Sequence, residues 1–367
     1  CVTGRAVREP RAKLGFEIHI DGAAVLSRAA ELPPVTLYKQ NVNLSLDSHL
    51  AYRPVVLRHP LVRAVFRLQD GLCRGFREYL TAQDFTEIHS PKIVSAGAEG
   101  GANIFKLDYF GRRAFLAQSP QFYKQMMVGV FERVYEVAPV FRAEPHATIR
   151  HTNQFTSLDA ELGFIEDHHD VMAVVTHVIH GILETLQTVH ADALTELGVV
   201  MPLTPASFPV VHFADAQRLI YERHGEDCRG EPDLAPQHER WLGEWARESY
   251  GSDFLFVTGY PMAKRPFYTH PDPADPTYSN SFDLLFRGME MITGGQRLHL
   301  YEDYLDALRR YNLSPEPCEG YLEAFRYGMP PHGGFAIGME RAVMQLVQAE
   351  NLRETTLFPR DLHRLTP

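Results

Sequence analysis

Two arginines flank a polar loop in the first half of the chain, an arrangement suited to binding a polyphosphate. Residues 134–141 form an apolar, β-prone run that leads into Arg142 and Glu144, and Arg150 lies at the far end of the loop that follows. Guanidinium groups bind phosphate oxygens through planar, bidentate hydrogen bonds. The segment therefore predicts a β-hairpin whose loop presents two cations to an anionic ligand.

The second strand of this predicted hairpin carries an aromatic ring and two carboxylates. Phe155, Asp159 and Glu161 are separated by even numbers of residues, so a strand places all three on one face. The ring offers a stacking plane for a base, and the carboxylates offer partners for an amine or a metal. In isolation, such a phenylalanine is more often a core residue, and an Arg-x-Glu pair is more often a surface ion pair.

A glycine-rich segment near the end of the chain is typical of a strand that runs into a helix. Residues 333–341 read Gly-Gly-Phe-Ala-Ile-Gly-Met-Glu-Arg, with Arg341 at the junction. Ala336 interrupts the glycines, so the backbone at that point is not expected to adopt positive φ. Upstream, an amphipathic helix leads to a strand that contains Pro91. Its apolar side is formed by Leu61, Val65, Leu72, Phe76 and Leu80.

These three segments, in this order, resemble motifs 1, 2 and 3 of the class II aminoacyl-tRNA synthetases, in the form found in the aspartyl enzymes. The resemblance implies an α+β catalytic domain, with an antiparallel sheet flanked by helices, and a homodimer whose interface the first motif builds. The interval between the second and third motifs leaves no room for the large inserted domain of the typical bacterial aspartyl enzyme. The chain is therefore similar to the archaeal-type subgroup.

The resemblance assigns ATP-binding roles to residues of both later motifs. Arg142 would bridge the α-phosphate and the attacking carboxylate, Arg341 would hold the γ-phosphate, and Phe155 would stack on adenine opposite Arg341. Both arginines would be catalytic, because this chemistry depends on positioning and on positive charge at the reacting oxygens. Further contacts on the ATP side are expected from Glu144, Arg150, His151 and Glu290.

Two acids in an apolar segment suggest a site for a hard cation. Asp283 and Glu290 lie among Phe282, Leu284 and Met291, so their strands are expected to be buried and the acids to need partners. In the family the two positions bind Mg²⁺, which prefers a few carboxylates together with phosphates. Thr293 stands where a hydroxyl assists that metal.

Residues 118–125, Gln-Ser-Pro-Gln-Phe-Tyr-Lys-Gln, closely resemble the aspartyl signature. The resemblance implies that Lys124 and Arg297 bind the side-chain carboxylate of aspartate and that Asp159 receives its α-ammonium. The asparaginyl enzymes lack this lysine. A neutral amide would leave the two buried cations uncompensated, so asparagine is expected to be excluded. The remaining aspartate contacts are expected from Gln121, Thr293, His332 at the pocket rim, and Glu99 in a Gly/Ala-rich lid.

Composition excludes several classes of protein. The chain has 367 residues, of which 45% are hydrophobic and 22% charged, with a net charge of −10. No apolar run reaches the ~18 residues that span a bilayer, so no membrane partner is expected. Four scattered cysteines suggest reduced thiols and a cytoplasmic location. The negative charge argues against DNA as a partner and restricts RNA contact to a local basic patch.

The domain organisation is predicted from composition and from the resemblance. Residues 1–30 are interpreted as the C-terminal part of an OB-fold anticodon-binding domain whose front is missing, 31–45 as a linker, and 46–367 as the catalytic domain. Three β segments, over 2–9, 15–20 and 23–27, are too few for the about five strands of an OB barrel. Periodicity predicts helices over 120–130, 167–186 and 236–250, strands over 254–258, 281–286 and 289–292, and a hairpin turn over 108–113.

The function that the resemblance implies is that of an aspartate–tRNA ligase. Such an enzyme joins aspartate to ATP as aspartyl-adenylate and passes the aspartyl group to the 3′ end of tRNA-Asp; charging of tRNA-Asn remains open. One alternative is a paralogue that makes asparagine from the same adenylate without tRNA. Another is an inactive homologue that only binds tRNA or protein, although such relatives tend to lose a motif arginine or a metal acid, and this chain has them all.

Overall fold

The computed structural model divides the chain into two compact units, Cys1–Asn43 and Leu44–Pro367. It describes residues 1–12, 14–39, 41–97, 103–146 and 148–366. The first unit contains an antiparallel pair, β1 (Val2–Arg8) and β2 (Phe16–Ala23). The prediction of a third strand over 23–27 is wrong. Ala24 still donates to the Cys1 carbonyl at 2.9 Å, but residues 25–27 face no strand among the described residues of this unit.

The second unit is built on an eight-stranded sheet with the order β3-β7-β8-β13-β12-β11-β10-β9. All pairs are antiparallel except β3–β7 and β10–β9. The strands span Thr86–Glu87 (β3), Arg133–Phe141 (β7), Gln154–Gly163 (β8), Val210–His212 (β9), Phe254–Thr258 (β10), Ser281–Phe286 (β11), Met289–Gln296 (β12) and His332–Gly338 (β13). Central strands rich in apolar residues explain why the middle of the sheet is buried on both faces.

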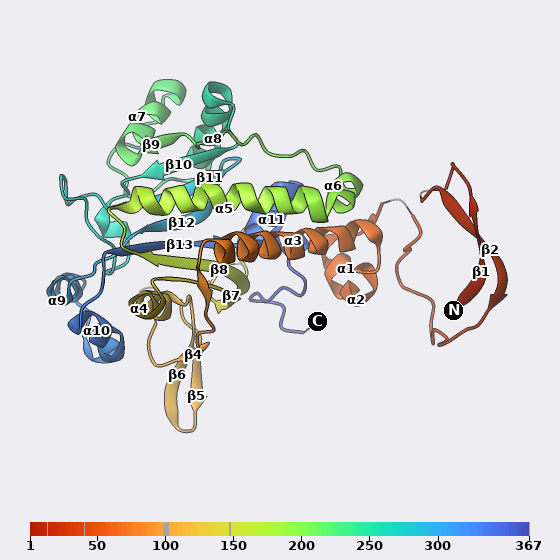
Figure 1. Ribbon diagram of the computed structural model, residues 1–367, viewed down its shortest axis with the longest axis horizontal. Helices are drawn as coiled ribbons and strands as arrows, with labels where there is room; N and C mark the ends of the chain where they lie inside the picture. The colour runs from red at the N-terminus through yellow and green to blue at the C-terminus, as the bar shows by residue number, and fades with distance from the viewer. Residues whose placement is uncertain (13, 40, 98–102, 147, 367) are drawn as a thin grey trace. The chain divides into compact units, whose positions relative to one another are not determined.

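Two long helices cover one face of this sheet. Helices α3 (Pro60–Ala82) and α5 (His168–Val189) run side by side (Figure 1) and share the main hydrophobic core with the sheet. The expected apolar stripe of α3 faces this core: Leu72, Phe76 and Leu80 are buried. Gly75 lets the helices approach closely, because a Cβ there would lie 2.8 Å from the Cα of Ile182.

Smaller helices pack around the sheet and its two long helices, with α6 and α11 against α3. The helices are α1 (Leu46–Ala51), α2 (Arg53–Val56), α4 (Gln121–Phe131), α6 (Ala191–Leu197), α7 (Phe213–His224), α8 (Pro236–Tyr250), α9 (Tyr301–Arg310), α10 (Glu319–Arg326) and α11 (Met339–Val347). Short 3₁₀ turns span Met262–Lys264, Glu316–Cys318 and Leu352–Thr355. A second sheet has the order β4 (Ile93–Val94), β6 (Arg112–Leu116), β5 (Lys106–Tyr109).

This architecture confirms the α+β class with an antiparallel sheet flanked by helices. One local prediction fails: Pro91 lies between β3 and β4 rather than within a strand, consistent with its lack of an N–H to donate to a ladder. Ala336 has an ordinary backbone conformation within β13, as expected. None of the described helices is long and apolar enough to cross a membrane.

Candidate active site

A cavity of about 400 Å³ opens on the sheet where β7, β8, β12 and β13 meet α4 and the start of α11. Most of the residues singled out in the sequence line it, although they come from segments far apart in the chain. They are Gln121, Lys124, Arg142, Glu144, Arg150, His151, Phe155, Asp159, Glu290, Thr293, Arg297 and Arg341. Adjacent strands bring them together, because β8 pairs with β7 and β13, and β13 pairs with β12.

Two of the expected residues that the structure describes are not found in the cavity wall. His332 does not lie at the rim: it is fully buried, with Nδ1 2.9 Å from the Pro330 carbonyl and Nε2 2.9 Å from the Gln125 amide. It belongs to the packing behind the wall. Asp283 is buried beside the cavity and accepts a hydrogen bond from Arg265 at 3.0 Å. Glu99 lies outside the described residues.

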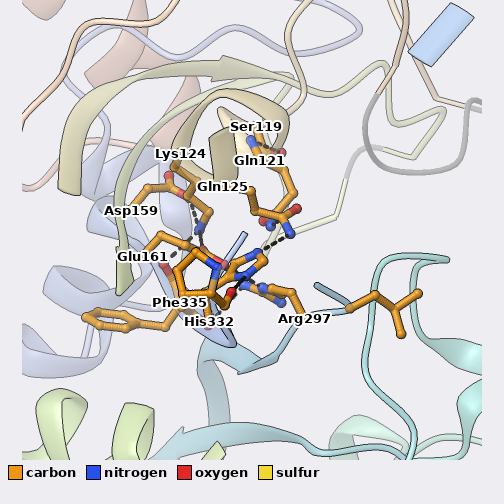
Figure 2. A network of polar contacts seen from close by, with 12 residues as sticks. Ser119, Gln121, Lys124, Gln125, Asp159, Glu161, Arg297, His332 and Phe335 are labelled. Atoms are coloured by element: carbon orange, nitrogen blue, oxygen red, sulfur yellow. Dashed lines mark hydrogen bonds and ion pairs between the residues drawn. The ribbon is translucent and has the colours of Figure 1, made fainter. Parts of the chain in front are cut away.

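The floor of the cavity is a buried cluster of two cations and two carboxylates. Lys124 Nζ lies 2.9 Å from Asp159 Oδ1 and 3.3 Å from Glu161 Oε2, and it donates to the Phe335 carbonyl at 3.1 Å. Arg297 Nε lies 2.9 Å from Glu161 Oε1. Figure 2 shows Lys124 between the two acids, with Arg297 on the other side of Glu161. The cations expected to await a substrate carboxylate are therefore already paired.

Glu161 joins the two cations and remains ionised. Burial alone would raise its pKa, but the charges of Arg297 and Lys124 outweigh burial and hold the pKa below the usual value. A buried carboxylate of this kind is stable only because both cations compensate it. Its position on the same face as Phe155 and Asp159 follows from the even spacing along β8.

The outer part of the cavity is cationic. Arg142, at the end of β7, is exposed and its Cζ lies 5.4 Å from the centre of the Phe155 ring. Arg341, in the first turn of α11, donates to the Glu290 carbonyl at 3.0 Å and lies 3.6 Å from its carboxylate. Arg150 instead pairs with Glu239 of α8 at 2.9 Å. Arg142 and Arg341 thus line the same cavity as the Phe155 ring. Two cations and a stacking plane are suited to binding a nucleoside triphosphate.

An acidic pair lies next to these arginines. Asp283 faces Thr293 across the β11–β12 ladder, and the Thr293 hydroxyl donates to Glu290 at 3.1 Å. Burial raises the pKa of Asp283 to about 6; the Arg265 charge opposes this rise and the Glu290 charge adds to it. Two carboxylates and a hydroxyl are ligands that Mg²⁺ accepts, and a cation between the acids would relieve their repulsion. The residues present therefore fit this metal.

Sequence reasoning missed several polar residues around the cavity. Arg265, which pairs with Asp283, and Glu340 both line the wall. The two Glu340 oxygens accept the Thr156 N–H at 3.1 and 3.0 Å. Glu340 precedes Arg341 in the third motif, so its place in that motif was an available signal, whereas nothing in the local sequence around Arg265 distinguishes it.

A buried hydrogen-bond chain behind the wall was also missed. Gln121 donates to the Gln125 side chain at 2.9 Å, and Gln125 donates to the Tyr304 hydroxyl at 3.0 Å. The Tyr321 hydroxyl lies 2.9 Å from the Gln125 side-chain oxygen and 2.8 Å from the Tyr304 hydroxyl. This chain fixes α4 against α9 and α10, and so holds the face that carries Lys124. Gln125 ends the segment that resembled the aspartyl signature, which is the only sequence signal for it.

The sheet, the motif arginines and the cavity define a class II synthetase catalytic core. A family model described as tRNA synthetases class II (D, K and N) matches residues 45–362, and the chain belongs to this family. An aspartate–tRNA(Asp/Asn) ligase of Thermus thermophilus is 50% identical over 366 residues, covering 100% of this chain and 86% of the relative. One of Deinococcus radiodurans is 48% identical over 371 residues, covering 100% and 85%.

A solved structure supports the same placement. The asparaginyl-tRNA synthetase of Pyrococcus horikoshii, complexed with asparaginyl-adenylate, aligns with a TM-score of 0.92 and 30% identity, covering 100% of this chain and 83% of that one. The backbone is therefore shared between aspartyl and asparaginyl members of the family.

Proposed function

We propose that this protein is an aspartate–tRNA ligase that accepts both tRNA-Asp and tRNA-Asn. One observation carries the proposal: a single cavity joins a floor containing Lys124 and Arg297 to an outer part containing Arg142, Phe155 and Arg341. The floor offers cations to an amino acid with a carboxylate side chain, and the outer part offers cations and a stacking plane to ATP. The two relatives named for both tRNAs, at 48% and 50% identity, support the tRNA scope.

The side chains divide the reaction between them. Asp159 receives the α-ammonium of aspartate, which turns the α-carboxylate toward Arg142. Arg142 bridges this carboxylate and the α-phosphate, and Arg341 holds the γ-phosphate. Positioning and charge thus assemble the attack of the carboxylate on the α-phosphorus, which forms aspartyl-adenylate and releases pyrophosphate. Phe155 holds adenine. The terminal ribose of the tRNA then attacks the aspartyl-adenylate and releases AMP.

Asp283, Glu290 and Thr293 would hold Mg²⁺ in this scheme. When bound, the metal neutralises charge on the phosphate oxygens. Replacing both acids with amides, Asp283→Asn with Glu290→Gln, is expected to raise the Mg²⁺ concentration needed for half-maximal pyrophosphate exchange. An unchanged metal requirement in the double variant would make the acids structural.

The protein is further proposed to act as a cytoplasmic homodimer, with the region of α3 as its interface and residues 1–30 contributing to tRNA binding. Sedimentation of the purified chain tests the dimer. A monomer at assay concentrations would contradict it.

The decisive experiment measures three products with the purified chain. We expect aspartate-dependent ATP–pyrophosphate exchange, no asparagine-dependent exchange, and aspartylation of both tRNAs. Ammonia supplied without tRNA should give no asparagine. Asparagine formation would identify the tRNA-independent paralogue, and absence of exchange with any amino acid would identify an inactive homologue.

A further inference from the structure

The Lys124 ammonium in the cavity floor is enclosed by acceptors. It donates to Asp159 at 2.9 Å and to the Phe335 carbonyl at 3.1 Å, it is ion-paired with Glu161 at 3.3 Å, and the residue is only 1% exposed. A ligand carboxylate that comes into contact with Lys124 in this enclosed floor must take the place of one of these three acceptors. The surroundings of each acceptor decide which one can leave.

Two of the three acceptors are fixed. The Phe335 carbonyl belongs to the middle of β13, which is paired on both sides with β8 and β12. Glu161 is completely buried and is held by Arg297 through its other oxygen at 2.9 Å. Gly334 packs so closely on Glu161 that a Cβ there would lie 2.0 Å from Oε2, so this carboxylate has no space to move.

Asp159 is the acceptor that can be released. It lines the cavity, whereas Glu161 and Phe335 do not. Its second oxygen is hydrogen-bonded to Ser157, a neighbour on the same face of β8 that also lines the cavity. An incoming ammonium can therefore reach Asp159 and compensate its charge without any movement of the sheet.

We propose that aspartate binds by exchange with the Lys124–Asp159 pair: the α-ammonium takes Asp159, and the side-chain carboxylate takes the donor of Lys124 that Asp159 gives up. This inference rests on the proposed function and explains how the floor selects its substrate. The floor holds two cations and two carboxylates before binding, and the same charges plus one ligand cation and one ligand anion after it. The ligand ammonium replaces Lys124 as the partner of Asp159, and the ligand carboxylate replaces Asp159 as the partner of Lys124. A ligand that lacks either charge cannot complete the exchange.

The exchange gives a different reason for the exclusion of asparagine. Lys124 and Arg297 are already paired with carboxylates in the free protein. The amide side chain of asparagine is therefore disfavoured only after the ligand ammonium has bound Asp159, because Lys124 has then lost that carboxylate. Succinate, which lacks the ammonium, meets a Lys124 that is still bound to Asp159. Succinate thus leaves its own carboxylate, and asparagine leaves Lys124, short of one charged partner, and both should bind at least about 100-fold more weakly than aspartate.

Binding of aspartate, succinate and asparagine to the full chain, measured by calorimetry, tests the exchange. In Asp159→Asn, Lys124 keeps Glu161 but loses the Asp159 carboxylate, so succinate should gain about tenfold or more in affinity while aspartate loses about tenfold or more. Asp215→Asn is the matched control, since it removes a half-exposed carboxylate of α7 that does not line the cavity. Its effect on succinate should stay within about threefold.

A second variant, Lys124→Met, tests the exchange independently if Asp159→Asn fails to fold. In Lys124→Met, the ammonium of asparagine can take Asp159 without leaving a cation behind. Asparagine should then bind more tightly than to the wild type, and the aspartate-to-asparagine ratio should fall to within about tenfold. A succinate gain no larger than that of Asp215→Asn, or no asparagine gain in Lys124→Met, overturns the exchange. A wild-type chain that binds no aspartate at all would instead overturn the proposed function.

Discussion

Arg142 is the residue whose loss should be most damaging to chemistry. Its backbone is fixed by Asn153, which accepts the Arg142 N–H at 2.9 Å and donates to its carbonyl at 2.8 Å, so the side chain alone changes on truncation. Arg142→Ala should slow aspartate-dependent pyrophosphate exchange by ~10²-fold or more, because it removes charge stabilisation at the reacting phosphorus. Arg218→Ala, on the exposed face of α7, is the control. Exchange within about tenfold of wild type would remove Arg142 from the site.

Glu340 should make stability depend on pH. Burial raises the pKa of this carboxyl from 4.5 to about 7, against the effect of its backbone hydrogen bonds. The folded protein thus holds a proton that the unfolded chain releases, so this contribution to stability is full at low pH and is lost as pH rises toward 7 and above.

Glu340→Gln keeps one acceptor for the Thr156 N–H and cannot ionise. The unfolding free energy of the wild type relative to this variant should fall by at most about 3 kcal/mol between about pH 5 and about pH 8. Thermal unfolding of both proteins across that range measures the difference. A difference that does not change with pH would show that Glu340 titrates normally.

The types and spacing of the site residues could be read from the sequence because the motifs are local. Phe155, Asp159 and Glu161 share a face wherever β8 forms, and Arg341 follows a strand directly. The contacts that these side chains make with one another could not be predicted from the sequence. That Lys124 donates to the Phe335 carbonyl, and that His332 is buried, depends on β13 lying between β8 and β12, which no local pattern specifies.

At the scale of elements, the packing of α3 on α5 depends on a glycine. A Cβ at Gly75 would meet the Ile182 backbone at 2.8 Å and Thr185 at 3.1 Å. Gly75→Ala should therefore destabilise the protein by about 1–3 kcal/mol, because two helices would have to move apart.

Gly320→Ala is the matched control, since Gly320 also lies in a helix, α10, with no atom within 4 Å of an added Cβ. It should be neutral or stabilise by up to about 1 kcal/mol. Chemical denaturation of both variants gives the comparison. Equal effects would show that α3 and α5 adjust freely.

Most elements could be predicted because their patterns are strong. The strands over 254–258 and 281–286 and the helix over 236–250 are found at the expected residues. The strand predicted over 289–292 extends to Gln296 in the structure. Its added part contains Gly294 and Gly295, at positions where neighbouring atoms leave no space for a side chain. Glycine is depleted in strands in general, so composition alone ended that strand too early.

At the scale of the whole molecule, the cavity belongs entirely to the second unit, since its lining lies within residues 118–352. Removing residues 1–43 should therefore leave aspartate-dependent exchange within about threefold of the full chain and reduce tRNA charging much more strongly. Parallel exchange and charging assays on both forms separate the two steps. Loss of exchange in the shorter form would contradict the independence of the second unit.

Salt should affect the binding of the two substrates differently, because the floor of the cavity is buried and its outer part is exposed. Mobile ions screen charges that contact solvent and hardly affect buried pairs. Aspartate exchanges partners within a floor where Lys124 is 1% exposed, so its KM should change little as salt is raised. In the proposed reaction ATP binds the exposed Arg142 and the partly exposed Arg341, so the KM for ATP should rise. Titrating KCl from about 0.05 to about 0.5 M measures both constants. An equal response of the two substrates would mean that the floor opens to solvent before aspartate binds.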